Sequence, residues 1–250
     1  MGQPQIITAP DRQAVGREAA RVVEAALTAG ELSTLGVATG SSPLPLYRAL
    51  AASRPEGLSE IAAFALDEYV GLDPQHPESY RQVVRREVTE PLGLDPHKVR
   101  VPDGAAENPA LAARMYEEQI AASGGIDLQI LGIGGNGHIA FNEPGSERIS
   151  LTRVVDLTPA TRIDNSRFFD HPDEVPRQAI TQGVATILRA RRLLLVVHGP
   201  TKSGLLRRAF EGPVTPDFPA SFLQSHPQVT VVADQVSAQG LSTILAPAAR

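Results

Sequence analysis

Short apolar runs, separated by segments of a different periodicity, constrain the fold more than any other feature of the sequence. The runs are rich in Val, Ile and Leu and show little polar alternation, which is typical of strands buried on both faces of a parallel sheet. They cover residues 34–39, 61–66, 127–133, 152–157, 193–198 and 229–233.

Segments with helical periodicity occupy most of the intervals between these runs. They cover residues 12–28, 43–52, 79–88, 109–122, 176–189 and 201–210. Asp11 stands where an N-cap is expected, and Asn108 precedes a Pro that suits the first turn of a helix. Alternating strands and helices predict a doubly wound, mainly parallel α/β sheet with helices on both faces, a Rossmann-like fold.

Residues 1–250 are predicted to form a single domain of this kind. The 42% of hydrophobic residues suffice for a sizeable core. The chain has no internal repeat, low-complexity linker or composition break that favours a boundary.

Charge and composition exclude several classes of partner. The net charge of -5 arises from intermixed charges, so we expect a small-molecule partner and no binding to nucleic acid or to an acidic membrane. The absence of cysteine excludes disulfides, thiolate metal sites and a cysteine nucleophile. The first residues lack the signal-peptide pattern, and no window approaches about 20 apolar residues, so we expect a soluble cytoplasmic protein.

Polar residues cluster where the predicted strands end. The clusters are residues 39–42, 67–68, 134–143 and 198–202. Ligands of doubly wound sheets bind beyond the carboxyl ends of the strands. We therefore expect these clusters to converge on one rim of the sheet.

Gly132, Gly134 and Gly137 match the glycine spacing of a dinucleotide-binding turn, and Asp156 stands where a ribose-binding acid is expected. Such a turn opens a helix that packs on the sheet and points at the pyrophosphate. Pro144-Gly145 follows too soon for a helix of normal length. A tight glycine turn with incidental polar residues is a second alternative, but neither accounts for the residues around His138.

His138 lies between Asn136 and Glu143, which can hold its ring in one tautomer while the second ring nitrogen transfers protons. Asp67 and Glu68 follow a buried strand, where one carboxyl can act as a base and the other can cap or pair. A satisfied histidine and a merely polar strand end are the alternatives for these two clusters. Their expected position on the same rim favours a proton-transfer site.

Thr39-Gly40-Ser41-Ser42 joins a strand to a helix and offers backbone N–H groups and hydroxyls to a phosphate. An ordinary Ser N-cap before a Pro is the alternative. Lys202 can add positive charge to such a site, although a Lys at the start of a helix is also common on an exposed surface.

Three stretches together resemble the glucosamine-6-phosphate deaminase family, also called glucosamine-6-phosphate isomerases. They are FALDEYVGLDPQHPESY at 64–80, LGIGGNGHIAFNEP at 131–144 and NSRFFD at 165–170. With TGSSP at 39–43 and Thr201-Lys202, the resemblance extends over most of the chain. It implies a sugar-phosphate isomerase/deaminase fold and conversion of glucosamine 6-phosphate and water to fructose 6-phosphate and ammonia in amino sugar catabolism. It also implies no organic cofactor and no metal.

The resemblance assigns roles to individual residues. Asp67 matches the base that moves a proton from C2 to C1, His138 the ring-opening acid and base, and Glu143 its carboxylate partner. The TGSSP loop, Arg167 and Lys202 match sugar-phosphate contacts. The predicted catalytic residues are Asp67, Asn136, His138 and Glu143, and the predicted substrate-binding residues are Thr39, Gly40, Ser41, Ser42, Glu68, Gly134, Gly135, Arg167 and Lys202.

Two departures from the family pattern matter. Some members carry Asp at the position of Asn136, and an amide can orient the ring but cannot compensate an imidazolium charge, which leaves that role to Glu143. Other members bind an effector phosphate just after the NEP motif. Here Ser146 and Arg153 suit that role, whereas Glu147 would repel a phosphate, Val155 replaces a basic residue and the final residues contain no aromatic side chain. We expect a non-allosteric enzyme, either a monomer or a homo-oligomer.

Three alternative functions remain open. The 6-phosphogluconolactonase group shares the predicted fold but usually lacks the DEYVGL and FNEP stretches. Galactosamine 6-phosphate is a competing substrate within the deaminase interpretation. A sugar-phosphate sensor of a transcription regulator would carry an added helix-turn-helix segment and would need no proton-transfer residues.

Overall fold

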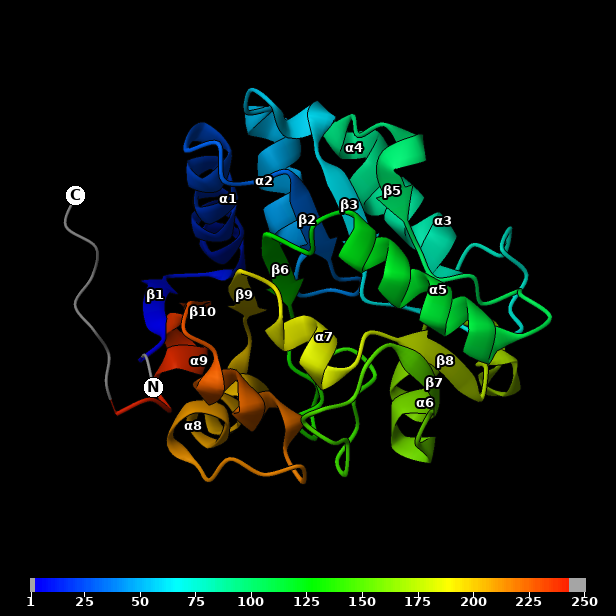
Figure 1. The fold of residues 1–250 in the computed structure, drawn as a ribbon. Helices are drawn as coiled ribbons and strands as arrows, with labels where there is room; N and C mark the ends of the chain where they lie inside the picture. Colours follow the sequence, from blue (N-terminus) through cyan, green and yellow to red (C-terminus); the bar gives the residue numbers. More distant parts are fainter. Residues whose placement is uncertain (1–2, 243–250) are drawn as a thin grey trace.

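A parallel sheet of seven strands forms the centre of the computed structural model, which describes residues 3–242 (Figure 1). The strands lie in the order β1 (Gln5–Ala9), β10 (Val229–Asp234), β9 (Arg192–Val197), β6 (Leu128–Leu131), β2 (Thr34–Val37), β3 (Ala62–Ala65) and β5 (Val99–Arg100). All neighbouring pairs run parallel. The predicted doubly wound α/β fold is confirmed; the edge strands β1 and β5 were not predicted.

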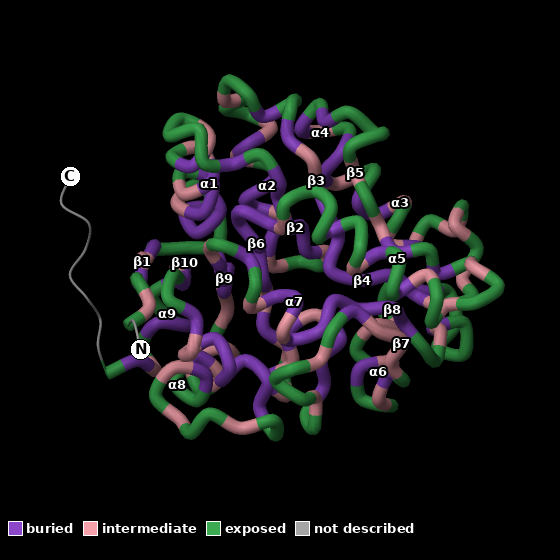
Figure 2. Tube along the Cα trace, in the orientation of Figure 1, coloured by how far each residue is buried: buried purple, intermediate pink, exposed green. Residues whose placement is uncertain are grey.

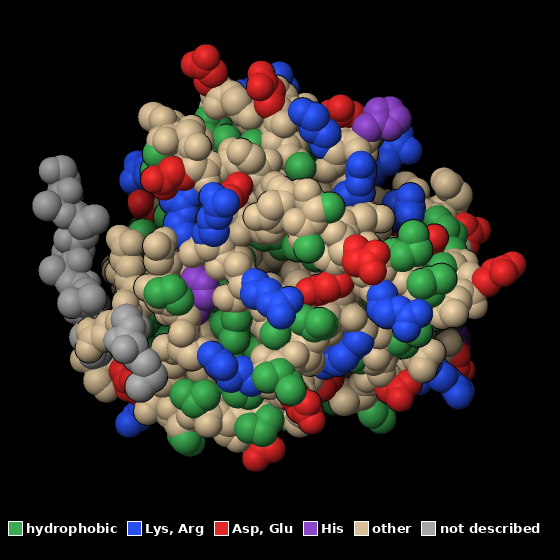
Figure 3. Space-filling model, in the orientation of Figure 1, with side chains coloured by type: hydrophobic (Ala, Val, Ile, Leu, Met, Phe, Trp, Pro, Cys, Tyr) green, Lys and Arg blue, Asp and Glu red, His purple; other side chains and the backbone are tan. Residues whose placement is uncertain are grey.

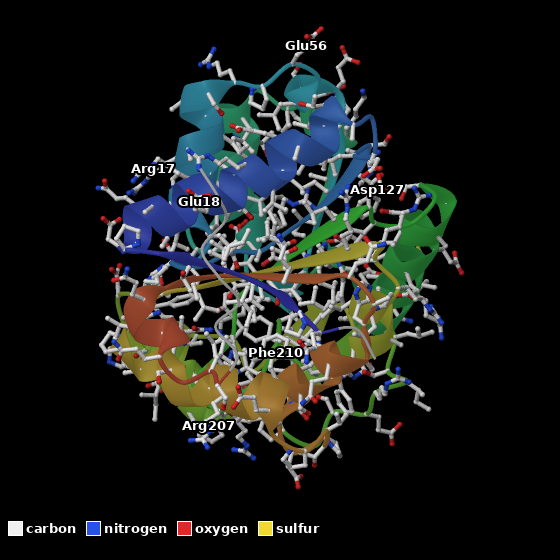
Figure 4. The ribbon with its side chains drawn as sticks, turned by 90° about the vertical axis from the view of Figure 1, so that its left-hand side faces the viewer. Arg17, Glu18, Glu56, Asp127, Arg207 and Phe210 are labelled. Atoms are coloured by element: carbon white, nitrogen blue, oxygen red, sulfur yellow. The ribbon has the colours of Figure 1, made fainter. Side chains whose placement is uncertain are left out.

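Helices cover both faces of this sheet. Figure 4 shows α1 (Arg12–Thr28) and α2 (Leu44–Ser53) on one side of the strands and α8 (Ser203–Glu211) with α9 (Gln235–Ala238) on the other. Helix α1 begins where the sequence predicted, because the Asp11 carboxylate accepts a hydrogen bond from the backbone N–H of Ala14 at 2.8 Å. The other helices are α3 (Tyr80–Val84), α4 (Glu90–Leu92), α5 (Pro109–Ala122), α6 (Pro159–Ser166) and α7 (Val184–Leu188).

Short segments of other helix types complete the connections. One π-helical turn, η2 (Arg85–Thr89), joins α3 to α4. The 3-10 turns are η1 (Leu58–Glu60), η3 (Pro96–Lys98), η4 (Pro172–Glu174), η5 (Pro200–Lys202) and η6 (Pro219–Ser225). Among residues 3–242, no helix combines the length and the apolar character that a membrane span requires.

A second, antiparallel sheet corrects two sequence predictions. It contains β4 (Asp67–Tyr69), β8 (Gln178–Thr181) and β7 (Arg153–Asp156), which lie at the lower right in Figure 1. The run 152–157 was expected in the parallel sheet but belongs here as β7. The segment 176–189 was predicted as one helix but forms β8 and then α7.

Tertiary pairing explains why the helical prediction for 176–189 was wrong. Ile180 of β8 pairs with Glu68 on one side and Val154 on the other, and both partners are distant in sequence. Gly183, the N-cap of α7, lies where the chain passes close to another segment, since a Cβ atom there would lie 2.2 Å from the Ser150 carbonyl oxygen. Long-range hydrogen bonds and burial therefore outweigh local periodicity.

The order of the parallel strands reverses between β2 and β6. From β2 the chain continues outward to β3 and β5, and then returns to place β6 on the opposite side of β2. Such a reversal leaves a crevice beyond the carboxyl ends of the two strands, where ligands of doubly wound folds bind. The loops that follow β2 and β6 are residues 38–43 and 132–144, which contain two of the predicted polar clusters.

The central strands are buried along most of their length, and exposed residues concentrate in the loops (Figure 2). One polar side chain interrupts this core. Gln129 of β6 is fully buried, and its Nε2 donates to the Ile130 carbonyl at 2.9 Å, while its Oε1 has no hydrogen-bond partner. Its amide lies over Gly36 of β2, where a Cβ atom would be 2.0 Å from that oxygen.

We predict that Gly36→Ala destabilises the protein by about 1–3 kcal/mol, because the added methyl overlaps the buried Gln129 amide. The double variant Gly36→Ala/Gln129→Ala should recover part of the loss, because the shorter side chain at 129 makes room. Urea unfolding of both single variants and the double variant measures the coupling. Strictly additive losses would show that the two residues do not compete for the same space.

Candidate active site

A cavity of about 550 Å³ lies at the carboxyl ends of β2, β3 and β6. Most of the predicted site residues line it, namely Thr39, Gly40, Ser41, Ser42, Asp67, Gly134, Gly135, His138, Arg167 and Lys202. Glu68, Asn136 and Glu143 do not line the cavity and lie behind its wall. Further lining side chains that the sequence analysis did not single out include Tyr80, Arg86, Glu87, Thr161, Asp164 and Asn165.

Asp67 is a buried carboxyl that faces the cavity from β4. Its strand position pairs it with Thr181 of β8, so the second sheet fixes its backbone. Burial, together with the nearby charge of Glu68, raises the pKa of Asp67 to about 8. A carboxyl with a raised pKa is suited to proton transfer near neutral pH.

Glu68 points away from the cavity and organises the neighbouring loop. Its carboxylate accepts hydrogen bonds from the backbone N–H groups of Tyr69 at 2.8 Å, Tyr80 at 2.9 Å and Arg81 at 2.8 Å. Burial raises its pKa, while these three bonds act in the opposite direction. The predicted role of Glu68 in substrate binding thus becomes an indirect one, since it holds Tyr80 in the cavity wall.

His138 is connected to Glu143 through Asn136. The Asn136 Oδ1 atom lies 2.8 Å from Nδ1 of His138 and also accepts from the His138 backbone N–H at 3.1 Å. The Asn136 Nδ2 group donates to Oε2 of Glu143 at 2.6 Å. His138 Nδ1 itself is 3.7 Å from that oxygen. The Asn136 amide therefore links the His138 ring to the Glu143 carboxylate through its two contacts.

The charge of Glu143 determines the orientation of the Asn136 side-chain amide. Burial alone would raise the pKa of Glu143, but the His138 ring and the hydrogen bonds from Thr161 and Asn136 lower it to about 2. An ionised carboxylate only accepts hydrogen bonds, so Asn136 must present its NH₂ group to Glu143 and its oxygen to His138. That oxygen also only accepts, so the neutral His138 ring carries its proton on Nδ1. Its Nε2 atom is then free to accept a proton.

Two threonines that the sequence analysis missed hold the other oxygen of Glu143. Thr161 and Thr158 both donate to Oε1, the bond from Thr161 being short and that from Thr158 being 3.3 Å long. Thr158 is also the N-cap of α6. The sequence pattern TPAT predicts an N-cap before a Pro, but not the carboxylate 15 residues earlier that the hydroxyl contacts.

Two glycines of the loop 132–144, which we call the catalytic loop because it carries the predicted catalytic residue His138, make room for aromatic rings. A Cβ atom at Gly134 would lie 2.1 Å from the Cε1 and Nε2 atoms of His138. Gly137 has φ of +88°, and a Cβ atom there would lie 2.2 Å from the Phe218 ring. After Gly137 the chain forms turns and the isolated bridge between Ile139 and Asn142, with no helix. The backbone thus departs from the dinucleotide-binding turn, as the early Pro144 predicted.

The loop 39–42 and the cationic side chains of Lys202 and Arg167 also line the cavity. The loop 39–42 follows β2, and Gly40 takes a left-handed conformation with φ of +88°. Arg12 donates to the Ser41 carbonyl at 2.9 Å from outside the cavity. Lys202 donates to the Ile133 carbonyl at 2.7 Å, and burial lowers its pKa. Arg167 ends helix α6 and also lines the cavity.

These features suit a phosphorylated polyol. Within the described residues, no group of three or more His, Asp or Glu side chains is arranged to hold a metal ion. The cavity combines the polar loop 39–42, two cationic side chains, a buried carboxyl and an oriented imidazole, which can bind an anion and transfer protons. On the face drawn in Figure 3, Lys and Arg alternate with Asp and Glu, so that face carries no basic patch of the kind that binds nucleic acid.

Comparisons with known proteins identify the family of the chain. A family model described as glucosamine-6-phosphate isomerases/6-phosphogluconolactonase matches residues 11–232. The glucosamine-6-phosphate deaminase of Streptomyces avermitilis is 48% identical over 241 residues, which cover 95% of this chain and 92% of the relative. That of Rhodopirellula baltica is 44% identical over 237 residues, with 94% of each chain covered.

Solved structures give the same result. A monomeric glucosamine-6-phosphate deaminase superposes with a TM-score of 0.90 at 34% identity and covers 95% of this chain and 100% of its own. The 6-phosphogluconolactonase from Trypanosoma cruzi superposes with a TM-score of 0.78 at 21% identity, over 97% and 99% of the two chains. At that identity the likeness concerns the fold alone.

We predict that Asp67→Asn removes a pH dependence of stability. The folded-state pKa of Asp67, about 8, exceeds the unfolded value of about 3.9, so the folded chain retains a proton that the unfolded chain releases. Stability should therefore fall as pH rises between these values, by up to about 1.4 kcal/mol per unit, in the wild type but not in the variant.

Urea unfolding at intervals between about pH 5 and about pH 8 measures this difference, with exposed Asp217→Asn as the matched control. If Asp67→Asn and the wild type lose stability in parallel across this range, the Asp67 carboxyl is ionised in the folded protein and the expectation is wrong.

Proposed function

We propose a function from the premise that this chain belongs to the glucosamine-6-phosphate isomerase/6-phosphogluconolactonase family: it converts glucosamine 6-phosphate and water to fructose 6-phosphate and ammonia. The observation that carries the proposal is the presence of two proton-transfer groups in one cavity. Asp67 and His138 both line it, and the second is oriented by Asn136 and Glu143. Residues 1–250 act as one catalytic domain.

Ring opening is the first step, and His138 performs it. The Nε2 atom, free in the tautomer that Asn136 imposes, accepts the proton of the O1 hydroxyl and returns it to the ring oxygen as the C1–O5 bond breaks. The imidazolium formed in between is stabilised by the ionised Glu143, 3.7 Å from Nδ1. Asn136 contributes orientation but no charge.

Enolisation follows at Asp67. The ionised form of its carboxylate removes the C2 proton of the open-chain aldehyde and delivers it to C1, while a proton from the amino nitrogen passes to O1. The product carries a hydroxyl group at C1 and an imine at C2. Water adds to this imine, and the C2–N bond breaks to give the ketone and ammonia. Each step moves protons or water and requires no electron acceptor, so we propose a reaction without an organic cofactor or a metal.

The phosphate binds at the cationic end of the cavity. Backbone N–H groups and hydroxyls of residues 39–42, with Lys202 and Arg167, form its binding site. Binding at this remote group orients C1 and C2 between the two catalytic side chains.

Asp67 separates this function from lactone hydrolysis on the same fold. Opening a phosphogluconolactone requires attack by water at a carbonyl but no proton transfer between C2 and C1. A buried carboxyl with a raised pKa lowers the stability of the folded protein. The proposed role of Asp67 in enolisation explains why the protein nevertheless carries this group.

Regulation by an effector phosphate is not part of the proposal. Arg153 donates to Asn142 Oδ1 at 2.9 Å and to Ser146 Oγ at 3.3 Å, so both residues suited to a phosphate are engaged with the protein. Glu147 lies in the same segment. Val155 packs against a small hydrophobic cluster formed by Tyr69, Phe141, Leu157, Phe169, Val175 and Ala179. The final residues that entered the expectation, 243–250, lie outside the described part of the chain.

A coupled assay for fructose 6-phosphate and ammonia tests the function directly. We expect the purified protein to turn over glucosamine 6-phosphate, and Asp67→Asn and His138→Gln each to lower kcat by about 10²–10⁴-fold. Asp217→Asn should behave as the wild type. Full turnover by Asp67→Asn would disprove the role of that residue. Turnover of a phosphogluconolactone, or of galactosamine 6-phosphate alone, would replace the proposed substrate.

Saturation kinetics test the absence of regulation. We expect a hyperbolic dependence of rate on glucosamine 6-phosphate that added N-acetylglucosamine 6-phosphate does not change, since Arg153 and Ser146 are already paired. A sigmoidal curve that the effector renders hyperbolic would contradict this prediction.

A further inference from the structure

Glu143 has no contact with the cavity of its own and affects it only through the side chains that it contacts. It is 8% exposed and does not line the cavity. Its Oε2 atom faces Asn136 and His138, and its Oε1 atom faces helix α6. The orientation of the carboxylate therefore depends on what α6 donates.

Thr161 is the principal donor from that helix. Its hydroxyl forms the short bond to Oε1, and its side chain is buried. The single hydroxyl proton of Thr158 is shared, because Thr158 Oγ1 lies 3.3 Å from Glu143 Oε1 and 3.1 Å from Thr161 Oγ1. Thr158 also accepts from the Thr161 backbone N–H at 3.2 Å, which is its role as the N-cap.

We propose that Thr161 is a positioning residue for ring opening, and that its hydroxyl starts the chain of contacts through Glu143 and Asn136 that leaves Nε2 of His138 free to accept a proton. This inference rests on the proposed function. Without the hydroxyl, one carboxylate oxygen loses its main donor, and the carboxylate can rotate away from Asn136. The freed amide can then turn its NH₂ group toward His138, which favours the opposite tautomer.

Helix α6 connects Glu143 with the part of the cavity that we assign to the phosphate. Thr161 stands near its N-terminus, Asp164 and Asn165 line the cavity in the next turn, and Arg167 caps its C-terminus. The short helix thus holds Glu143 at one end and reaches the phosphate-binding end of the cavity at the other. Thr161 fixes the position of α6 relative to the catalytic loop.

The test compares Thr161→Val, which removes the hydroxyl at nearly constant volume, with Thr161→Ser, which keeps it. Arg162→Ala is the matched control on the same helix, because Arg162 anchors α6 to the Val175 carbonyl at 3.0 Å and does not touch Glu143. Kinetics are measured on glucosamine 6-phosphate. The ¹⁵N shifts of the His138 ring, recorded without substrate, report which nitrogen carries the proton.

We expect Thr161→Val to lower kcat by about 10–100-fold with little change in KM, because geometry is lost while phosphate binding remains. Thr161→Ser should recover most of this loss, and Arg162→Ala should stay within about threefold of the wild type. The proton should lie on Nδ1 in the wild type and in Thr161→Ser, and distribute over both nitrogens in Thr161→Val. Should Thr161→Val fail to fold, Thr161→Ala is judged by the same measurements.

Several outcomes overturn the inference while the proposed function stands. They are an unchanged kcat and an unchanged tautomer in Thr161→Val, an equal loss in Arg162→Ala, and no recovery in Thr161→Ser. A wild type that does not release ammonia overturns the proposed function and, with it, the ring-opening role of Thr161.

Discussion

Strands β2 and β6 pair over only two residues, Leu35 with Leu128 and Gly36 with Gln129, and the cavity depends on that short ladder. On its other side β2 pairs with β3 over four residues. The loops that follow β2 and β6 both line the cavity, and they carry the residues that we assign to phosphate binding and proton transfer. A longer ladder would close the space between these loops with backbone hydrogen bonds.

The small antiparallel sheet holds Asp67 in a fixed and buried position. A carboxyl that takes a proton from carbon must be rigid and largely shielded from water, and both conditions oppose its ionisation. Asp67 meets them because β8 fixes its backbone and surrounding side chains bury it. Glu143 is in the opposite situation, since hydrogen bonds stabilise its charge. Two buried carboxyls in one site thus differ in pKa because one has donors around it and the other has few.

The sequence predicted those parts of the fold that local chemistry decides. Helices α1 and α5 begin at the predicted residues because Asp11 and Asn108 cap them. The second sheet was missed because β4 pairs with β8, more than a hundred residues away, and no local pattern in 176–189 reveals that partner. The same limit applies to the site. Motifs pointed to His138 and Asp67, but the contact of Thr161 with Glu143 and the hydrogen bonds by which Glu68 holds the backbone of Tyr80 follow only from contacts made after folding.

The two aromatic rings that occupy the space beside Gly134 and Gly137 also constrain how the sequence can diverge. As long as His138 covers residue 134 and Phe218 covers residue 137, any other amino acid at these positions displaces a ring. Gly134 is therefore required as long as the imidazole keeps its present position, and a smaller side chain at position 138 would remove that requirement. Packing against the His138 and Phe218 rings therefore accounts for two of the three glycines, and the nucleotide-like spacing of this loop requires no bound nucleotide.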